Sequence, residues 1–393
     1  MQTEVPDLSS PATVIEPDTA RPGLEDGVAL CLSGGGYRAM LFHLGALWRL
    51  NEAGYLPSIK RISSVSGGSI SAGVLGLNWS KLAFDANGVG RRFESAVVPP
   101  IRSMAGRTID LPAIIGGALL PGPISERLVA AYRRHLFGES TLQDLPDDPP
   151  RFVINATNVQ SGALWRFMKP YMRDYRVGEV RNPRIELAVA VAASSAFPPV
   201  LSPLGLRLRA SDFSPPGPGE DLHMEPYTTD VVLTDGGVYD NLGLETAWKR
   251  YITILVSDGG SGMRAEPDPS YDWARHALRV YDLVDNQVRS LRKRQVVDSL
   301  KTGKRKGAYW GIGSDIANYQ LPDSLPCPVE KTSALARIAT RLKKLDSGLQ
   351  ERLINWGYAV CDAALRRHLN PKLPAPARFP YPAQAFIRLP FSS

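Results

Sequence analysis

The residues best suited to chemistry in this sequence are a serine and two aspartates, each in a glycine-rich turn. Ser66 lies in Ser64-Val65-Ser66-Gly67-Gly68, which differs from the nucleophile-elbow pattern G-x-S-x-G only in having Ser64 as its first residue. Asp235 and Asp258 each begin an Asp-Gly-Gly turn after an apolar run. A carboxylate within hydrogen-bond reach of a serine can accept its proton without a histidine. These residue types indicate nucleophilic catalysis by Ser66, although a purely turn-forming role stays open for each of them.

Three consecutive glycines can supply the groups that stabilise negative charge in such a reaction. Gly34, Gly35 and Gly36 follow a strand-like run and precede a helical pattern, so their N–H groups can point to an anion or oxyanion near the helix dipole. Gly34, Gly36 and Ala39 also satisfy the dinucleotide pattern G-x-G-x-x-A. The acidic residue that binds the ribose is, however, missing after the second strand. This favours an oxyanion site over a nicotinamide or flavin site.

Short apolar runs bounded by turn residues predict the strands that position these turns. The runs are Val28–Leu32, Arg61–Val65, Phe152–Ala156, Val231–Thr234 and Ile252–Val256. Helical spacing from Met40 to Gly54 follows the first run, and the small-residue segment Ser69–Leu77 follows the second. Strands that alternate with helices predict an α/β layered domain with buried parallel strands. Both aspartates then lie at carboxyl ends of strands, where open α/β sheets bind ligands.

The chain divides into three predicted regions. Residues 1–26 are polar, acidic and rich in proline, and we expect a disordered or loosely packed tail. Residues 27–262 form the predicted catalytic core. Residues 263–393 form a mostly helical region that we expect to pack on the core. Its helical patterns are Trp273–Leu291, Thr332–Leu345 and Gln350–Leu369.

Two stretches of the core are predicted to be irregular, Val97–Gly122 and Leu208–Thr229. Long loops in compact domains often serve as lids or binding loops. Within the first stretch, the apolar segment Leu111–Leu120 has two flexible glycines at its centre, flanked by isoleucines and leucines. A lid or membrane-dipping segment and a turn in the core are both open for it.

The composition excludes several classes of protein. The chain has 393 residues, of which 44% are hydrophobic and 22% charged, as in globular proteins. Its three cysteines are too few and too scattered for a disulfide framework or a metal site, which favours a reducing compartment. No apolar run approaches the roughly 20 residues of a transmembrane helix, and the amino terminus has no signal-peptide pattern. We therefore expect a cytoplasmic protein, at most peripheral to the inner face of a membrane.

The formal net charge of +7 favours an anionic partner. Much of the positive charge gathers in one segment, which contains Arg289, Arg292, Lys293, Arg294, Lys301, Lys304, Arg305 and Lys306. A solvated helix face explains such a run. Attraction to anionic lipid headgroups also explains it, at about 1 kcal/mol for each basic residue near the surface, with Trp310 at the interface. Nucleic acid or a nucleotide messenger is the third interpretation.

Histidine is the usual base in α/β-hydrolases, where it follows the serine and the aspartate along the chain. His276 and His368 have that order, but both lie on predicted helices beside arginines. His43 falls within the first helix, where a packing role is expected. No cluster of His, Cys and carboxylates indicates zinc or iron. An aspartate base for Ser66 therefore stays open.

Together, these motifs resemble the patatin-like phospholipase family. The resemblance is carried by Ser33-Gly34-Gly35-Gly36-Tyr37-Arg38, then Val65-Ser66-Gly67-Gly68-Ser69, then Asp235-Gly236-Gly237 with Asn241 after it. It extends to Asn155-Ala156-Thr157-Asn158 and to Ala193-Ser194-Ser195-Ala196-Phe197-Pro198, and spans Val28 to Gly262.

The resemblance implies a three-layer α/β/α fold and a Ser-Asp dyad that cleaves acyl esters of lipids without metal or cofactor. Ser66 matches the nucleophile and Asp235 its base, while Asp258 is expected to be structural. The amides around Gly34, Gly35 and Gly36 match the oxyanion hole. Arg38 matches the family's arginine after the glycines, where it shapes the loop or meets a phosphate, and Gly67 belongs to the serine turn. Ala39 departs from the family's more usual glycine.

The expected partners are a phospholipid or other lipid ester and an anionic membrane surface, and no DNA. Two alternatives stay open. One is a soluble esterase or thioesterase on the same dyad, which would show no jump in activity at a lipid interface. The other is an effector activated by a cyclic nucleotide, similar to patatin-like enzymes of bacterial antiphage systems, with a sensor in the C-terminal third.

Overall fold

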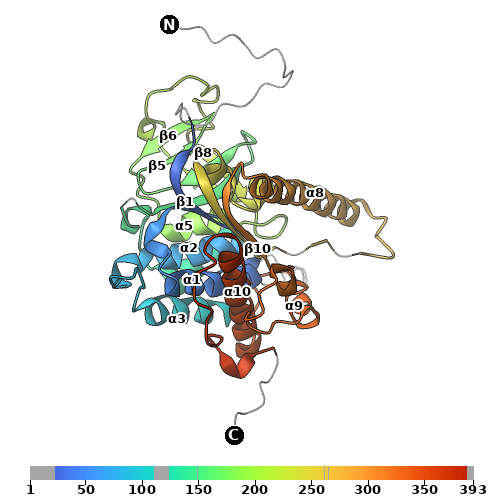
Figure 1. Ribbon diagram of the computed structural model, residues 1–393. Helices are drawn as coiled ribbons and strands as arrows, with labels where there is room; N and C mark the ends of the chain where they lie inside the picture. Colours follow the sequence, from blue (N-terminus) through green and yellow to red (C-terminus); the bar gives the residue numbers. More distant parts are fainter. Residues whose placement is uncertain (1–22, 110–123, 148, 261, 264, 387–393) are drawn as a thin grey trace.

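The computed structural model describes residues 23–109, 124–147, 149–260, 262–263 and 265–386 (Figure 1). Its centre is a ten-stranded sheet. The strands are β1 (Glu25–Leu32), β2 (Ile59–Ser64), β3 (Arg151–Asn158), β4 (Leu164–Phe167), β5 (Tyr171–Asp174), β6 (Gly178–Arg181), β7 (Leu204–Arg207), β8 (Asp230–Asp235), β9 (Tyr251–Asp258) and β10 (Lys306–Gly311). The α-helices are α1 (Gly36–Glu52), α2 (Gly67–Leu77), α3 (Phe93–Ala105), α4 (Ile124–Tyr132), α5 (Leu187–Ser194), α6 (Gly237–Asp240), α7 (Glu245–Trp248), α8 (Trp273–Lys301), α9 (Val329–Ala336) and α10 (Ser347–His368).

The sheet is parallel on one side of β3 and antiparallel on the other. Strands β10, β9, β1, β2 and β3 are neighbours in this order and run parallel, whereas β4, β5 and β6 continue from β3 with alternating direction. The largely parallel sheet that the sequence predicts is thus confirmed. The antiparallel part was not predicted, because its four-residue strands are too short to show an apolar period.

Strand β8 corrects one prediction, because it runs antiparallel to β3 and also pairs antiparallel with β7. Val231–Thr234 was expected in a parallel strand. The register explains the arrangement: β2 pairs with β3 up to Ser64, opposite Ile154, and β8 pairs with the continuation of β3 from Asn158 back to Ala156, opposite Asp235. The carboxyl ends of β2 and β8 therefore approach each other along the same edge of β3.

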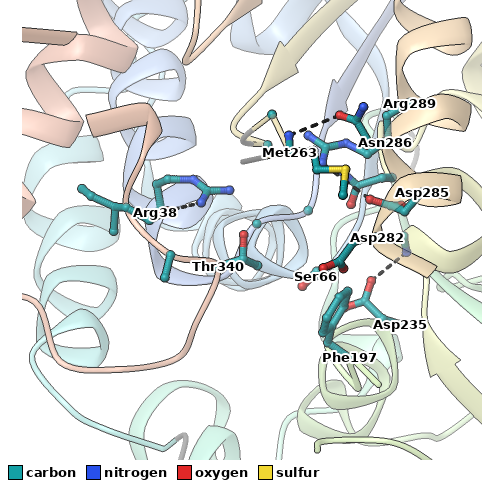
Figure 2. A pocket seen from close by; sticks show the side chains of 18 of the residues that line it. Arg38, Ser66, Phe197, Asp235, Met263, Asp282, Asp285, Asn286, Arg289 and Thr340 are labelled. Atoms are coloured by element: carbon teal, nitrogen blue, oxygen red, sulfur yellow. Dashed lines mark hydrogen bonds and ion pairs between the residues drawn. The ribbon is translucent and has the colours of Figure 1, made fainter. Parts of the chain in front are cut away.

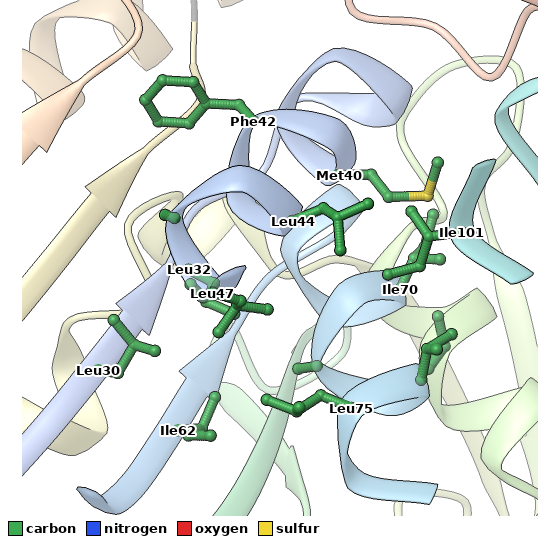
Figure 3. Packing of buried hydrophobic residues seen from close by; sticks show 14 of the residues in the cluster. Leu30, Leu32, Met40, Phe42, Leu44, Leu47, Ile62, Ile70, Leu75 and Ile101 are labelled. Carbon is green, nitrogen blue, oxygen red and sulfur yellow. The ribbon is translucent and has the colours of Figure 1, made fainter. Parts of the chain in front are cut away.

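Alternate side chains of β1 enter the two faces of the sheet, as the twofold period of a strand requires. Leu30 and Leu32 join the large core that α1, α2 and α3 cover, where Ile62 of β2 lies beside them (Figure 3). Ala29 and Cys31 point the other way, into a smaller cluster with residues of α7, α8 and β9. Two apolar faces under two sets of helices make the three-layer α/β/α arrangement, which confirms the predicted fold class.

The C-terminal region is continuous with this core. Strand β10 extends the parallel sheet beside β9, and α10 packs along α1 (Figure 1). The two helices approach closely at glycines, because a Cβ on Gly45 would lie 1.9 Å from the Ile354 carbonyl and one on Gly357 would lie 1.9 Å from the Phe42 carbonyl. A strand at 306–311 was not predicted, because a basic segment precedes it and it has no continuous apolar run.

Four further predictions differ from the structure or concern residues outside the described part of the chain. Residues 97–105 are not irregular but belong to α3, whose buried face overrides Pro99 and Pro100. The helix predicted over Thr332–Leu345 ends at Ala336, because the chain beyond it hydrogen bonds to other segments, as when Ile109 N–H donates to the Leu342 carbonyl. Leu111–Leu120 and residues 1–22 lie outside the described residues. Among those described, no helix is long and apolar enough to cross a membrane.

Candidate active site

Ser66 occupies a strained turn between β2 and α2. Its φ of 51° and ψ of −120° place a non-glycine residue in a conformation that L-residues rarely adopt. The turn must be this tight because Gly67 and Gly68 touch other backbone: a Cβ on Gly67 would lie 2.2 Å from the Gly36 carbonyl, and one on Gly68 would lie 2.4 Å from that of Leu32. Ser66 itself is 8% exposed, at the bottom of a cavity. The structure therefore presents this hydroxyl as a nucleophile elbow does.

Ser64, which replaces the first glycine of the elbow pattern, strengthens the turn. Its hydroxyl donates to the Val153 carbonyl at 3.2 Å and accepts from the Ser69 hydroxyl at 3.0 Å. Ser69 also contacts the Ser194 hydroxyl at 2.9 Å. A small polar residue thus fits where glycine was expected, and it joins a buried serine network.

Asp235 ends β8 next to this turn, and Figure 2 shows the two side chains at the base of the same cavity. Its Oδ1 accepts the Gly237 N–H at 2.7 Å, and the Ser66 hydroxyl lies near enough to lower the pKa of the carboxyl. Burial has the larger effect and raises the pKa to about 7, to which the negative charge of Asp285 contributes. Oδ2 has no hydrogen-bond partner among the described residues. A buried carboxyl that exchanges a proton near neutrality is suited to general base catalysis.

Ser194, at the end of α5, ties the two turns together. Its hydroxyl accepts the Ser66 N–H at 2.9 Å, and its carbonyl accepts the Gly236 N–H at 3.3 Å. The two turns that carry Ser66 and Asp235 are therefore fixed to one buried residue. A serine in a helix of small residues does not by itself indicate a role at a site. The sequence analysis therefore named Ser194 only as part of the motif from Ala193 to Pro198 and did not predict this contact.

The glycine loop lies against the serine turn, but its three amides are not equivalent. Gly34 N–H donates to the Asn241 carbonyl at 3.0 Å and is therefore engaged, contrary to its predicted role as an oxyanion donor. The N–H groups of Gly35 and Gly36 donate to no other backbone group that the structure describes. Both glycines have positive φ, 139° for Gly35 and 60° for Gly36, a backbone conformation that glycine adopts readily. This conformation sets the direction of the two amides at the start of α1. Of the predicted set, these two donors remain for an oxyanion.

Arg38, in the first turn of α1, fixes the position of the glycine loop through its buried side chain. Its side chain is 1% exposed; Nε donates to the Gly259 carbonyl at 3.0 Å, and Nη1 donates to the Ile338 carbonyl. It thereby connects α1, the turn after β9 and the segment after α9, while the guanidinium also lines the cavity. Of the two roles predicted for Arg38, these contacts favour loop shaping.

Asp258 has bonds that suit a structural role. Its Oδ2 lies 2.6 Å from Lys293 Nζ and accepts the Tyr309 hydroxyl at 2.7 Å, while Oδ1 accepts the Gly260 N–H at 2.9 Å. Burial alone would raise its pKa, but Lys293 and Arg289 lower it to about 2. A carboxylate that stays ionised and bonded in this way is a poor proton acceptor.

None of the described histidines lines the cavity that holds Ser66 and Asp235. His43 is buried, with Nε2 at 2.9 Å from the Ser33 carbonyl and Nδ1 at 2.8 Å from the Ser257 hydroxyl. Burial lowers its pKa to about 4, so it is neutral and supports the strand ends. His276 and His368 do not line the cavity. The structure describes no group of three or more His, Cys, Asp or Glu residues that could bind a metal ion.

The cavity over Ser66 has a volume of about 380 Å³. Gly34, Gly35, Ser66, Asp235 and Phe197 form its base, and the segment around Thr340 forms one side. Helix α8 forms the opposite wall, and Figure 2 shows Asp282, Asp285, Asn286 and Arg289 pointing inward. Arg279 of the same helix also lines the cavity. Sequence reasoning missed this wall, because α8 is distant in sequence from every motif.

The basic segment is divided between the interior and the surface. Lys293 pairs with the buried Asp258, Arg292 lies 3.2 Å from Glu245, and Arg305 donates to the Trp248 carbonyl at 2.9 Å. Trp310 is fully buried in β10, so its expected place at a membrane interface is wrong. Only part of the segment therefore remains available to a partner.

A comparison with protein-family models agrees with the motifs. The family model described as patatin-like phospholipase matches residues 30–248, more than half of the chain. Human GIVD cytosolic phospholipase A2 is 14% identical, with a TM-score of 0.39, over 62% of this chain and 49% of that one. VipD from Legionella pneumophila is 14% identical, with a TM-score of 0.37, over 87% and 67%. This chain spans about half the length of the human structure, and no curated protein matches it by sequence.

Proposed function

Because this chain belongs to the patatin-like phospholipase family, we propose that it hydrolyses acyl esters of phospholipids or related lipids with Ser66 as nucleophile and Asp235 as general base. The observation that supports this most is the pairing of the strained Ser66 turn with a buried carboxyl of pKa about 7. Each feature costs stability when taken alone. Such costs concentrate at functional sites.

In the first half of the reaction, Ser66 Oγ attacks the ester carbonyl carbon and its proton passes to Asp235. Oδ2 is the carboxylate oxygen with no other partner in the described chain, which makes it the natural acceptor. The tetrahedral oxyanion accepts hydrogen bonds from the N–H groups of Gly35 and Gly36, and each such donor typically raises the rate about 10²- to 10³-fold. Collapse of the intermediate expels the alcohol portion, to which Asp235 returns the proton.

In the second half, water hydrolyses the acyl-enzyme and releases the fatty acid. Asp235 accepts a proton from this water and returns it to Ser66, which restores the starting state. Since Asp235 must be ionised at the start of each half, activity requires a pH near or above its pKa of about 7.

The test is incubation with vesicles of mixed anionic and zwitterionic phospholipids and, separately, with a water-soluble ester. Fatty acid and lysolipid are measured by mass spectrometry, with Ser66→Ala as the control. Release from vesicles by the wild type alone is the expected result. Turnover of the soluble ester with no lipid release would replace the lipase with a soluble esterase, and release by Ser66→Ala would refute the nucleophile.

A further inference from the structure

Helix α8 has two opposite faces, of which only one belongs to the cavity. The other face carries apolar side chains spaced three or four residues apart, which places them along one side of the helix. We call this set the outer stripe; it consists of Trp273, Ala277, Val280, Val284, Val288 and Leu291. No member lines the cavity, and Trp273 is 85% exposed, Val284 57% and Leu291 52%.

The exposure of this helix is unusual for the molecule. Among its 29 residues only Val296 is buried. Seven of the fifteen exposed large apolar side chains in the described chain lie on α8. Figure 1 shows the helix extending sideways beyond the sheet and its covering helices. Since helices in proteins are stabilised mainly by packing of an apolar face, and contiguous exposed apolar surface marks interaction sites, the outer stripe needs a partner.

The charges near the outer stripe favour an anionic partner. Arg294, Lys301, Lys304 and Lys306 are exposed at and beyond the end of α8, and none forms an ion pair with another described residue. Five of the seven Lys and Arg of α8 pair with acidic residues of the described chain, which leaves the positive charges of Arg294 and Lys301 for a partner. Two copies of α8 would therefore repel each other, whereas anionic lipid headgroups attract such a helix. At the other end, Trp273 and the 95% exposed Tyr271 are of the type that lies at membrane–water interfaces.

We propose that the outer stripe of α8 docks on the surface of an anionic phospholipid bilayer, with the basic residues at its end on the headgroups. This rests on the proposed function, which requires the enzyme to meet lipid. Because the inner face of the same helix is a wall of the cavity, docking through α8 brings the dyad to the membrane. A charged helix with one apolar face lies in the plane of the membrane surface, with that face among the lipids, and does not span the bilayer.

The experiment measures binding separately from hydrolysis, in a Ser66→Ala background that leaves the vesicles intact. Co-sedimentation is measured with vesicles of phosphatidylcholine alone and of equal parts phosphatidylcholine and phosphatidylglycerol. The test variant is Val280→Asp/Val284→Asp. The control is Val159→Asp, because Val159 has the same 57% exposure as Val284 but lies at the end of β3. Unchanged melting temperatures show that both variants fold.

We expect the parent to bind the anionic vesicles. The double variant should bind them about 100-fold more weakly, because each Val→Asp change removes apolar burial that is worth roughly tenfold in affinity. The affinity of Val159→Asp should be unchanged. Equal binding by all three proteins, or none by the parent, overturns the proposal. So does a dimer, seen by light scattering without vesicles, that the double variant dissociates, because the stripe then binds a second copy. A parent that binds vesicles although the active enzyme releases no fatty acid would refute the proposed hydrolysis and leave the docking intact.

Discussion

Replacement of Asp235 by asparagine is expected to stabilise the fold while it removes the proposed base. Burial raises the pKa of Asp235 from 3.8 to about 7. Between pH 3.8 and about 7, the folded protein therefore keeps a proton on this carboxyl that the unfolded chain has released. The wild type therefore loses stability as pH rises from about 4 to 7, and the loss is complete above 7. A difference of about three pH units corresponds to at most about 4 kcal/mol.

The amide side chain in Asp235→Asn does not titrate and keeps an oxygen that can accept the Gly237 N–H, so the variant escapes this cost. The free energy of unfolding, measured with urea from pH 4 to 8, should be nearly equal in the two proteins at pH 4. By pH 8 the variant should be more stable by up to about 4 kcal/mol.

Asp258→Asn is the matched control of opposite sign. Lys293 and Arg289 lower the pKa of Asp258 to about 2, so this carboxylate contributes stability above pH 3.8 that is lost as pH falls through 2. Its removal should destabilise the protein at neutral pH and leave Lys293 without its buried partner. An Asp235→Asn effect that does not change with pH, or that is destabilising at pH 8, would refute the assignment of Asp235 as a buried, proton-exchanging carboxyl.

Two further predictions concern catalysis. The kcat/KM for a soluble ester should rise with pH to a plateau, with a midpoint near pH 7. Asp285→Asn should move this midpoint to lower pH, because the charge of Asp285 raises the pKa of Asp235. An unmoved midpoint would contradict the coupling between the two carboxyls. Gly67→Ala should lower turnover by about 10²-fold or more, because its Cβ would lie 2.2 Å from the Gly36 carbonyl and displace the oxyanion loop, whereas Gly205→Ala meets nothing within 4 Å and should keep full activity.

The sequence predicted the local parts of the site, because each is a short motif whose residue types follow from its conformation. The turn at Ser66 needs Gly67 and Gly68 for contacts that a Cβ would block, and the loop before α1 needs positive φ at Gly35 and Gly36. Such steric demands are visible in residue types. The parallel half of the sheet was predictable for the same reason, since its strands are continuous apolar runs.

The relation between these parts was not predictable from the local pattern. An apolar run does not state the direction of its strand, yet the antiparallel direction of β8 brings Asp235 to the end of β2. Engagement of the Gly34 amide by Asn241 depends on a contact far along the chain. Activation by a cyclic nucleotide and a place at the inner membrane face stay predictions.

The basic segment shows the same limit in another form. A count of charges predicts one positive surface, but the period of α8 turns Lys293 inward to Asp258 and leaves Arg294 outside. The helical spacing of Trp273, Val280 and Val284 was visible in the sequence. That this face is exposed depends on where α8 lies relative to the sheet.

The most direct test of the dyad is covalent labelling with a fluorophosphonate, followed by peptide mapping of the adduct. We predict one adduct, on Ser66, that is absent in Ser66→Ala and forms at least about 100-fold more slowly in Asp235→Asn, because the base no longer accepts the hydroxyl proton. An adduct on another residue, or an unchanged rate in Asp235→Asn, would contradict the Ser66–Asp235 mechanism.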